Sequence, residues 1–238
     1  MNDLFYTGIL EIQKSHYKVS KLPLYKQLLS AILAGIFIGL AAYSSLFTAS
    51  YFFLNKYYEL GKFVSAIVFP VGLVLVCTLG TNLFTGNCLS CISIPLKNSI
   101  KLLLTSWFGN LIGIILLSHV LPIPQIYYLF TDLAQTKASL QLQNAFILGI
   151  FCNILVCTGI VFYKISNSIA KLWIPIFLFV LCGFEHSIAD MFYLYFGMFN
   201  NIDLNAVCVL FVITLGNIFG GILLKIYGLI NRKPKSYP

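Results

Sequence analysis

Long apolar runs separated by short polar segments make up most of this chain. A helix needs about 20 apolar residues to cross the hydrocarbon core of a bilayer. Strands of a transmembrane barrel instead alternate polar and apolar residues, whereas the runs here are continuous. We therefore predict an all-α integral membrane protein with six transmembrane helices, at about 27–54, 63–96, 102–125, 144–163, 172–199 and 206–230.

The composition excludes an ordinary soluble enzyme. Of the 238 residues, 59% are apolar and only 9% are charged, against about 25% charged residues in a soluble globular domain. The net charge of +8 does not indicate nucleic-acid binding, because the basic residues lie in short segments between the apolar runs. We expect the lipid bilayer, and no nucleic acid, as a partner.

The positions of the basic residues predict the orientation. If both termini are cytoplasmic, twelve of the 15 basic residues lie in inside segments, and only Lys56, Lys62 and Lys137 lie outside. This bias is typical of the positive-inside rule. We predict a multi-pass protein of the cytoplasmic (inner) membrane with an N-terminal cytoplasmic segment, a channel domain and a basic cytoplasmic tail, at 1–26, 27–230 and 231–238.

The N-terminal segment has an approximate helical period, with apolar positions at Leu4, Ile9, Leu10 and Ile12 among charged ones. Two interpretations stay open. It is an amphipathic helix on the cytoplasmic membrane surface or under the pore, or it is a solvated tail with some helix. It lacks the compact apolar stretch and cleavage site of a signal peptide.

Spans three and six share a motif that indicates an internal repeat. Gly109-Asn110-x-x-Gly113 matches Gly216-Asn217-x-x-Gly220, and both continue into the same Ile-Leu-Leu sequence. Because each half has an odd number of spans, the second copy has to be inverted. Inverted repeats are typical of transporters, in which the permeation site lies between broken helices near the bilayer midplane.

Spans two and five occupy equivalent places in the two halves, and each contains signs of a break. Span two is too long for one crossing and contains a proline, two glycines and a polar stretch: Pro70, Gly72, Gly80 and 81–87. We predict two half-helices with a loop around 79–87. In span five, the polar stretch 183–190 interrupts the apolar run and predicts a second break. Unwound backbone at membrane depth has to be buried in protein or line a cavity.

Three ionisable residues, Glu185, His186 and Asp190, lie within span five. Such residues normally face a cavity or a partner, because a charge in lipid is costly. Imidazole gains and loses a proton near neutral pH, so we interpret His186 as a pore-facing proton donor rather than a core histidine bonded to a neighbouring helix. We expect Glu185 to point elsewhere on the helix and to hold the broken backbone or a neighbouring subunit.

Other polar residues receive simpler interpretations. Lys137 is by default a solvated lysine, although a cation above a pore mouth raises the local anion concentration. For the buried asparagines we expect interhelical hydrogen bonds: Asn110, Asn153 and Asn217.

Four motifs resemble those of the formate/nitrite transporter family, in the same order along the chain. They are Leu83-Phe84-Thr85-Gly86-Asn87, Cys152-Asn153-Ile-Leu-Val-Cys157, Gly183-Phe184-Glu185-His186-Ser187-Ile-Ala189 and Gly216-Asn217-Ile-Phe-Gly220-Gly221. The Gly-Phe-Glu-His-Ser motif is highly specific. The resemblance implies an aquaporin-like fold, a homopentamer with a pore in each subunit, and passive or proton-coupled transport of small monovalent anions.

The resemblance also implies roles for individual residues. The pore threonine and histidine are Thr85 and His186, the vestibule lysine is Lys137, and the apolar constrictions are Phe69, Leu73, Phe84 and Phe179. Two positions depart from the family pattern. Asn82 replaces a residue that is often acidic, and Asp190 replaces a usual asparagine. The carboxylate of Asp190 changes proton handling or forms a polar contact.

A transport mechanism follows from these roles. Removing the water from a charge costs many kcal/mol, so a bare anion crosses apolar rings only with help. Lys137 would attract the anion, and His186, hydrogen-bonded towards Thr85, would offer positive charge or a proton between the constrictions. Formate and nitrite lead as substrates, with hydrosulfide or short carboxylates such as lactate and acetate as alternatives.

Rival classes of protein fit the sequence less well. A membrane enzyme needs a convergent set of catalytic groups, and no such set is visible. Cys88 and Cys91 form a single CxxC without a second pair or a nearby histidine, so we expect no metal and no cofactor. An aquaporin-like neutral solute channel is the alternative of another class, but its Asn-Pro-Ala-like loops do not occur.

Overall fold

The computed structural model describes residues 2–199 and 201–230, and the predicted tail 231–238 lies outside them. The regular elements of the described residues are all helical. In chain order they are α1 (Asn2–Lys21), α2 (Leu24–Leu54), α3 (Tyr58–Val68), α4 (Val71–Leu79), α5 (Phe84–Asn87), the 3₁₀ turn η1 (Cys88–Ser90), α6 (Leu96–Val120), α7 (Tyr127–Ala138), α8 (Leu142–Ser166), α9 (Ile169–Leu181), α10 (Ser187–Met198) and α11 (Leu204–Ile230).

Five spans within the described residues are long and apolar enough to cross a membrane: α2, the continuous stretch of α3 and α4, α6, α8 and α11. The remaining predicted span, span five, is divided into α9 and α10. The prediction of an all-α membrane protein is confirmed. The predicted spans two and three leave residues 97–101 as a connector. This prediction was wrong, because Lys97 and Lys101 lie in the first turns of α6. A helix of 25 residues is about 37 Å long at 1.5 Å per residue and extends beyond a hydrocarbon core of about 30 Å.

The two predicted helix breaks are present. The first separates α4 from α5, and the second separates α9 from α10. Each begins at a glycine in the left-handed region, Gly80 with φ of 64° and Gly183 with φ of 69°. Glycine adopts this conformation without the steric cost that a Cβ imposes. The chain therefore turns out of helix at both sites through the same local device.

Replacing Gly80 by alanine is expected to lower the free energy of unfolding by about 1 kcal/mol, because a Cβ strains a left-handed backbone. A Cβ at this position would meet no atom within 4 Å, so backbone strain is the whole cost. Denaturation in detergent measures the loss. Gly80→Asn is the control, since asparagine tolerates the left-handed region better. Equal stability of the alanine variant and the unsubstituted protein would contradict this account.

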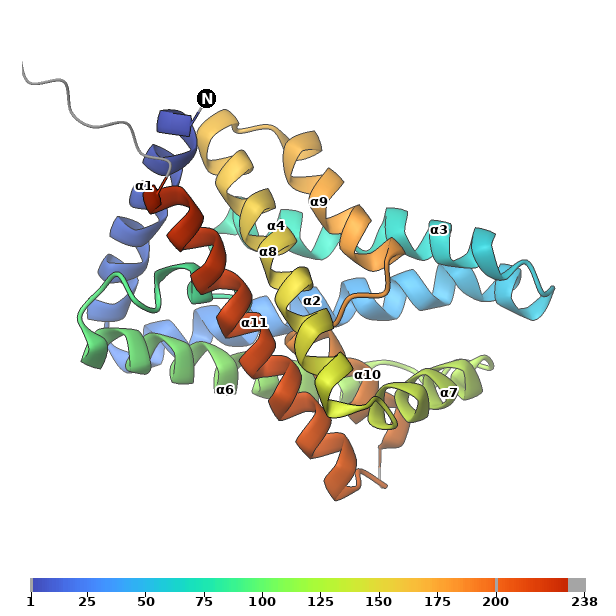
Figure 1. Cartoon of the computed structure of the whole chain (residues 1–238). Helices are drawn as coiled ribbons and strands as arrows, with labels where there is room; N and C mark the ends of the chain where they lie inside the picture. The colour runs from blue at the N-terminus through green and yellow to red at the C-terminus, as the bar shows by residue number, and fades with distance from the viewer. Residues whose placement is uncertain (1, 200, 231–238) are drawn as a thin grey trace, which may run out of the picture.

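The two halves of the chain have the same order of elements. Helix α2 packs against α6, α8 packs against α11, and in each half a broken segment lies between the two helices of the pair in sequence (Figure 1). Glycines of the repeated motif let the paired backbones approach closely. A Cβ on Gly220 of α11 would overlap the carbonyl oxygen of Ile150 on α8, and a Cβ on Gly113 of α6 would overlap the carbonyl oxygen of Ile32 on α2.

Helix α7 was not predicted, because its sequence is polar enough to be assigned to the connector 126–143. Its buried residues Phe130, Ala134 and Ala138 are spaced four apart, while Asp132 and Gln135 are exposed. This spacing is the signature of a helix with one buried face. The buried face packs against α10, which brings α7 beside the second helix break.

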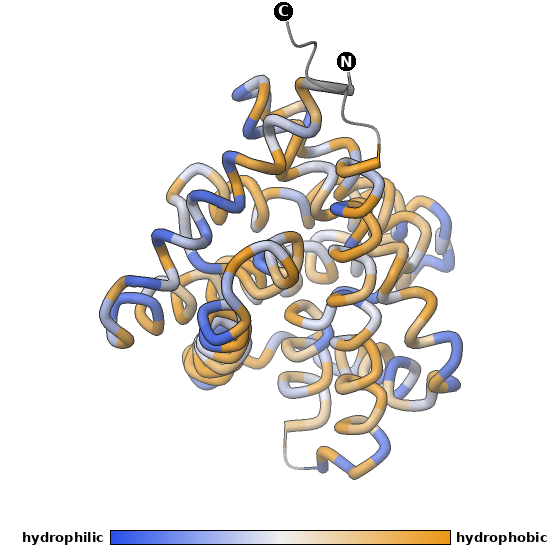
Figure 2. Tube along the Cα trace, turned by 60° about the vertical axis from the view of Figure 1, so that its left-hand side comes forward, coloured by the Kyte–Doolittle hydropathy of each residue, from blue (hydrophilic) through white to orange (hydrophobic). Residues whose placement is uncertain are grey.

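The outer surface of the molecule is apolar. Large side chains are exposed on the outer faces of three spans: Phe108, Leu116, Phe151, Phe211 and Phe219. Figure 2 shows apolar residues along the lengths of the helices and many of the hydrophilic residues at their ends and in the connections. Such a surface suits lipid or neighbouring subunits rather than water.

Candidate functional site

The two helix breaks meet at a buried hydrogen bond. Thr85 lies on α5 and His186 immediately precedes α10, and Thr85 Oγ1 lies 2.9 Å from His186 Nε2. Both residues are at most 3% exposed. The backbone N–H of Ala189 donates to His186 Nδ1 over 3.2 Å. Because Nδ1 is an acceptor, a neutral ring carries its hydrogen on Nε2 and donates it towards Thr85.

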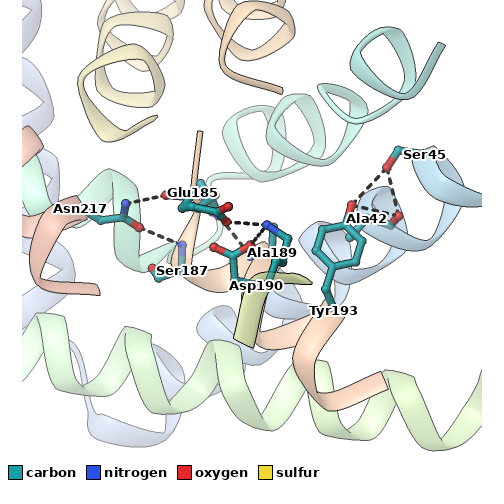
Figure 3. A network of polar contacts seen from close by, with 10 residues as sticks. Ala42, Ser45, Glu185, Ser187, Ala189, Asp190, Tyr193 and Asn217 are labelled. Carbon is teal, nitrogen blue, oxygen red and sulfur yellow. Dashed lines mark hydrogen bonds and ion pairs between the residues drawn. The ribbon is translucent and has the colours of Figure 1, made fainter. Parts of the chain in front are cut away.

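Two asparagines hold the broken helices in equivalent ways. Asn110 of α6 accepts the backbone N–H of Phe84 over 2.9 Å and donates to the carbonyl oxygens of Ala31 and Asn82. Asn217 of α11 accepts the backbone N–H of Ser187 over 2.9 Å (Figure 3). It donates to the carbonyl oxygens of Gly149 and Glu185.

Asn153 of α8 links the two breaks. Its side-chain amide donates to the carbonyl oxygen of Thr85 over 3.1 Å and to that of Asn217 over 2.5 Å. The three asparagines thus satisfy the unwound backbone that lipid would leave without partners. Hydrogen bonds between helices were expected for them, but not that most partners are backbone groups at or beside the breaks.

A cavity of about 360 Å³ lies beside α7 and reaches His186; we call it the α7-side cavity. Phe69 and Phe179 both line it, and their ring centroids lie 5.6 Å apart in an edge-to-face contact. The ring of Phe179 also stacks on His186, with centroids 5.9 Å apart. An aromatic pair therefore borders the route to the histidine.

Leu73 and Phe84 belong to the same buried apolar cluster as Phe69 and Phe179. They do not line the α7-side cavity, nor the second cavity described below. Both side chains are therefore part of the buried core outside the two cavities.

Lys137 is not a free cation. From α7 its Nζ contacts the carboxylate of Glu185 and lies 2.7 Å from Asp190 Oδ1. It also lies 5.5 Å from the ring centroid of Tyr193. The expectation of a solvated lysine was wrong, because α7 packs against α10 and buries the ammonium between two carboxylates. Figure 3 shows Glu185 and Asp190 beside each other in this cluster.

Glu185 also differs from its expectation. The prediction assumed that it shares a helix with His186, but residues 182–186 are not helical. Its side chain therefore faces the same cavity as His186 and binds Lys137, while only its backbone carbonyl bonds to Asn217. Tyr193, whose hydroxyl bonds to Ser45 and Ala42 on α2 (Figure 3), was missed by sequence reasoning. Its i+3 spacing from Asp190 on α10 was the available signal.

A second cavity of about 260 Å³ lies beside α1, and we call it the α1-side cavity. Its lining includes Asn82, Gly86 and Asn87 from the first break, so it approaches Thr85 from the other side. The amide of Asn87 donates to Asn82 Oδ1 over 2.6 Å, which gives the departure at Asn82 a partner within the loop.

Helix α1 packs against α8, α6 and α11 and contributes His16 to the α1-side cavity. Ring atom Nδ1 of His16 lies 2.7 Å from Ser90 Oγ on η1. Burial lowers the pKa of His16 to about 4. Lys164 of α8 lines the same cavity and adds positive charge. The sequence singled out no role for His16.

Acidification is expected to loosen the packing of α1. The pKa of His16 is about 4 in place and about 6.5 when exposed, so the packed state binds fewer protons between these values. Packing is therefore strongest above about pH 6.5 and weakens as the pH falls. Hydrogen exchange of α1 amides, corrected for intrinsic rates, measures this. His16→Asn should abolish the change, and an identical pH response in that variant would contradict the assignment.

Cys88 and Cys91 are free thiols. Within residues 2–199 and 201–230, no group of three His, Cys, Asp or Glu side chains is arranged to hold a metal ion.

Comparison with protein families gives one match over most of the chain, in which residues 8–230 fit the model of the formate/nitrite transporter family. A probable formate transporter from Methanothermobacter thermautotrophicus is 33% identical over 243 aligned positions, which cover 84% of this chain and 86% of that protein. A formate-nitrite transporter from Plasmodium vivax is 28% identical, over 75% of this chain and 64% of the longer relative.

Two solved structures share the fold. An ion channel of the formate/nitrite transporter (FNT) family superposes with a TM-score of 0.83 over 96% of this chain and 99% of the other, at 21% identity. A pentameric formate channel with formate bound superposes with a TM-score of 0.74 over 87% and 96%, at 26% identity. The architecture is the aquaporin-like fold of these channels. With its motifs, broken helices and fold in agreement, this multi-pass membrane protein belongs to the formate/nitrite transporter family and is a transport protein, not an enzyme.

Proposed function

We propose that this chain transports small monovalent anions, formate or nitrite first among them, across the cytoplasmic membrane. The observation that carries the proposal is the buried Thr85–His186 hydrogen bond, which joins His186 in the lining of the α7-side cavity to the residue next to Gly86 in the lining of the α1-side cavity. The formate transporter among the relatives and the formate-bound channel among the structures support the choice of substrate.

The proposed route leads from the α7-side cavity past Phe69 and Phe179 to His186, and from there past Thr85 to the α1-side cavity. Apolar rings disfavour a hydrated charge. The Nε2–H of His186 now donates to Thr85, and it would donate to an anion that takes the place of the threonine hydroxyl. If the ring first takes up a second proton from solution, it transfers one proton to the anion and returns to its neutral form, so the substrate leaves as its neutral acid and transport is proton-coupled. If it does not, transport is passive.

We also propose a homopentamer in which each subunit contains its own pore. The pentameric relative and the exposed apolar side chains along the spans support it. For the orientation we propose cytoplasmic termini, supported by the excess of basic residues on that side of the predicted topology. The α1-side cavity would then open to the cytoplasm and the α7-side cavity to the outside.

Reconstitution into liposomes tests the function. Initial uptake rates of formate, nitrite, hydrosulfide, lactate and acetate are measured in turn, with osmotic swelling in glycerol as the test for a neutral solute channel. The proposal expects saturable uptake of formate or nitrite above protein-free liposomes. Glycerol swelling without any anion uptake would contradict it and favour the aquaporin-like alternative. Uptake limited to lactate, acetate or hydrosulfide would keep the family function and correct the substrate.

A further inference from the structure

The ionic cluster in the α7-side cavity contains one cation and two carboxylates. Lys137 contacts both Glu185 and Asp190, and the three side chains are 12%, 7% and 2% exposed, respectively. With all three groups ionised, the cluster has a net charge of −1. A buried net charge acts strongly on its surroundings, because little water screens it. In that state the cluster repels an approaching anion, although it contains the lysine that would attract one.

Asp190 is the member of the cluster with an unused acceptor. Its Oδ1 lies against Lys137, but its Oδ2 is buried and has no hydrogen-bond partner among the described residues. A buried, charged carboxylate oxygen without a donor is costly, and a bound proton lowers that cost because it removes the charge. A single proton on Oδ2 also brings the net charge of the cluster to zero.

The other titratable groups nearby do not replace this proton. Lys62 of α3 lines the cavity but is paired with Glu59 over 3.1 Å on the exposed side. The hydroxyl of Tyr193 is bonded to α2. Cys152 of α8 is a buried thiol. Of the two remaining groups, Glu185 is paired with Lys137, and His186 is held by Thr85 and Ala189.

Asp190 is also close to the histidine in the chain. Its backbone N–H donates to the carbonyl oxygen of His186 over 2.9 Å, and both side chains line the same cavity. We propose that Asp190 makes anion entry depend on pH: its carboxylate cancels the attraction of Lys137, so anions reach His186 only while Asp190 holds a proton. This inference rests on the proposed function and makes the chain an acid-activated transporter.

The test compares anion uptake by the unsubstituted protein and Asp190→Asn over a series of pH values. Asparagine keeps an oxygen for Lys137 but leaves the cluster neutral at every pH. In the unsubstituted protein the flux should fall as the proton dissociates, and the decrease should approach about tenfold per pH unit. The variant keeps only the pH response of His186, so its flux should fall less steeply and exceed that of the unsubstituted protein by at least about fivefold near pH 8. Asp132→Asn, an exposed acid on α7, is the matched control and should follow the unsubstituted protein.

The outcomes separate the two claims. No anion uptake by the unsubstituted protein at any pH would overturn the proposed function and this inference with it. If that protein takes up anions normally, two results for Asp190→Asn would overturn only the inference. They are the same pH slope as in the unsubstituted protein, or a loss of flux at all pH values.

A second measurement observes the proton itself and does not require Asp190→Asn to fold. Infrared difference spectra of the unsubstituted protein should show a protonated-carboxyl band at acidic pH that disappears on alkalinisation. Asp190→Glu should shift this band, and Glu185→Gln should leave it in place. No protonated-carboxyl band across the pH range of the flux change would overturn the inference even if Asp190→Asn did not assemble.

Discussion

Replacing His186 by asparagine is expected to slow formate uptake by about tenfold to a hundredfold at neutral pH. A hydrogen bond to a charged group contributes about 1.5–3 kcal/mol, and each 1.4 kcal/mol is about a factor of ten. Asparagine is shorter than histidine and does not become positively charged near neutral pH. The variant therefore loses both the reach of Nε2 and the charge that a protonated imidazole supplies. Stopped-flow uptake into proteoliposomes measures the rate.

The same substitution is expected to change the pH dependence and the selectivity among anions. The imidazole gains a positive charge when it is protonated, and asparagine removes this part of the pH response. His119→Asn is the matched control, because His119 lies at an exposed contact with Tyr195 on the outer side of the fold. Unchanged flux across a pH series in His186→Asn would contradict a role for the histidine in passage.

Replacing Asn217 by alanine is expected to be strongly destabilising, with a loss of about 2–4 kcal/mol in the free energy of unfolding. The substitution leaves the N–H of Ser187 and the carbonyls of Gly149 and Glu185 without their amide partner. Hydrogen bonds between membrane helices average only about 0.6 kcal/mol. That average applies where the groups that lose a partner find another one. The unwound backbone here is fully buried, so its groups would stay without a partner.

Denaturation in detergent and the yield of assembled protein measure the effect of Asn217→Ala. Asn110→Ala should behave in the same way, because it removes the equivalent bonds in the first half. Asn55→Ala is the control, since the side chain of Asn55 makes only an exposed bond to Tyr51, and it should cost less than about 0.5 kcal/mol. A loss for Asn217→Ala no larger than for Asn55→Ala would contradict the bracing role.

The sequence predicted the spans and both breaks because each leaves a local signature. Apolar runs of membrane length have few soluble alternatives, and Gly80 and Gly183 interrupt such runs beside polar residues. The repeated Gly-Asn motif further predicted that α6 and α11 are equivalent. Helix α7 was missed because its polar exposed residues concealed a buried face with a spacing of four.

The candidate site could be predicted as a set of residues but not as an arrangement. Motifs identified Thr85 and His186, yet the tautomer of the histidine follows from the N–H of Ala189, which depends on where α10 begins. The pairing of Lys137 with Glu185 and Asp190 depends on the packing of α7 against α10. No local pattern reveals such a contact between residues about 50 positions apart, and it changes the lysine from an expected solvated cation into part of an ionic cluster.

Contact between the substrate and the histidine tests the central claim most directly. The chain has three histidines, so ¹⁵N-histidine labelling gives few signals, and ¹³C-formate supplies the second spin. Solid-state NMR of the protein in lipid should detect dipolar coupling between formate and the side chain of His186, and this coupling should be lost in His186→Asn. If the protein transports formate but shows no dipolar coupling between formate and that histidine, the account is contradicted.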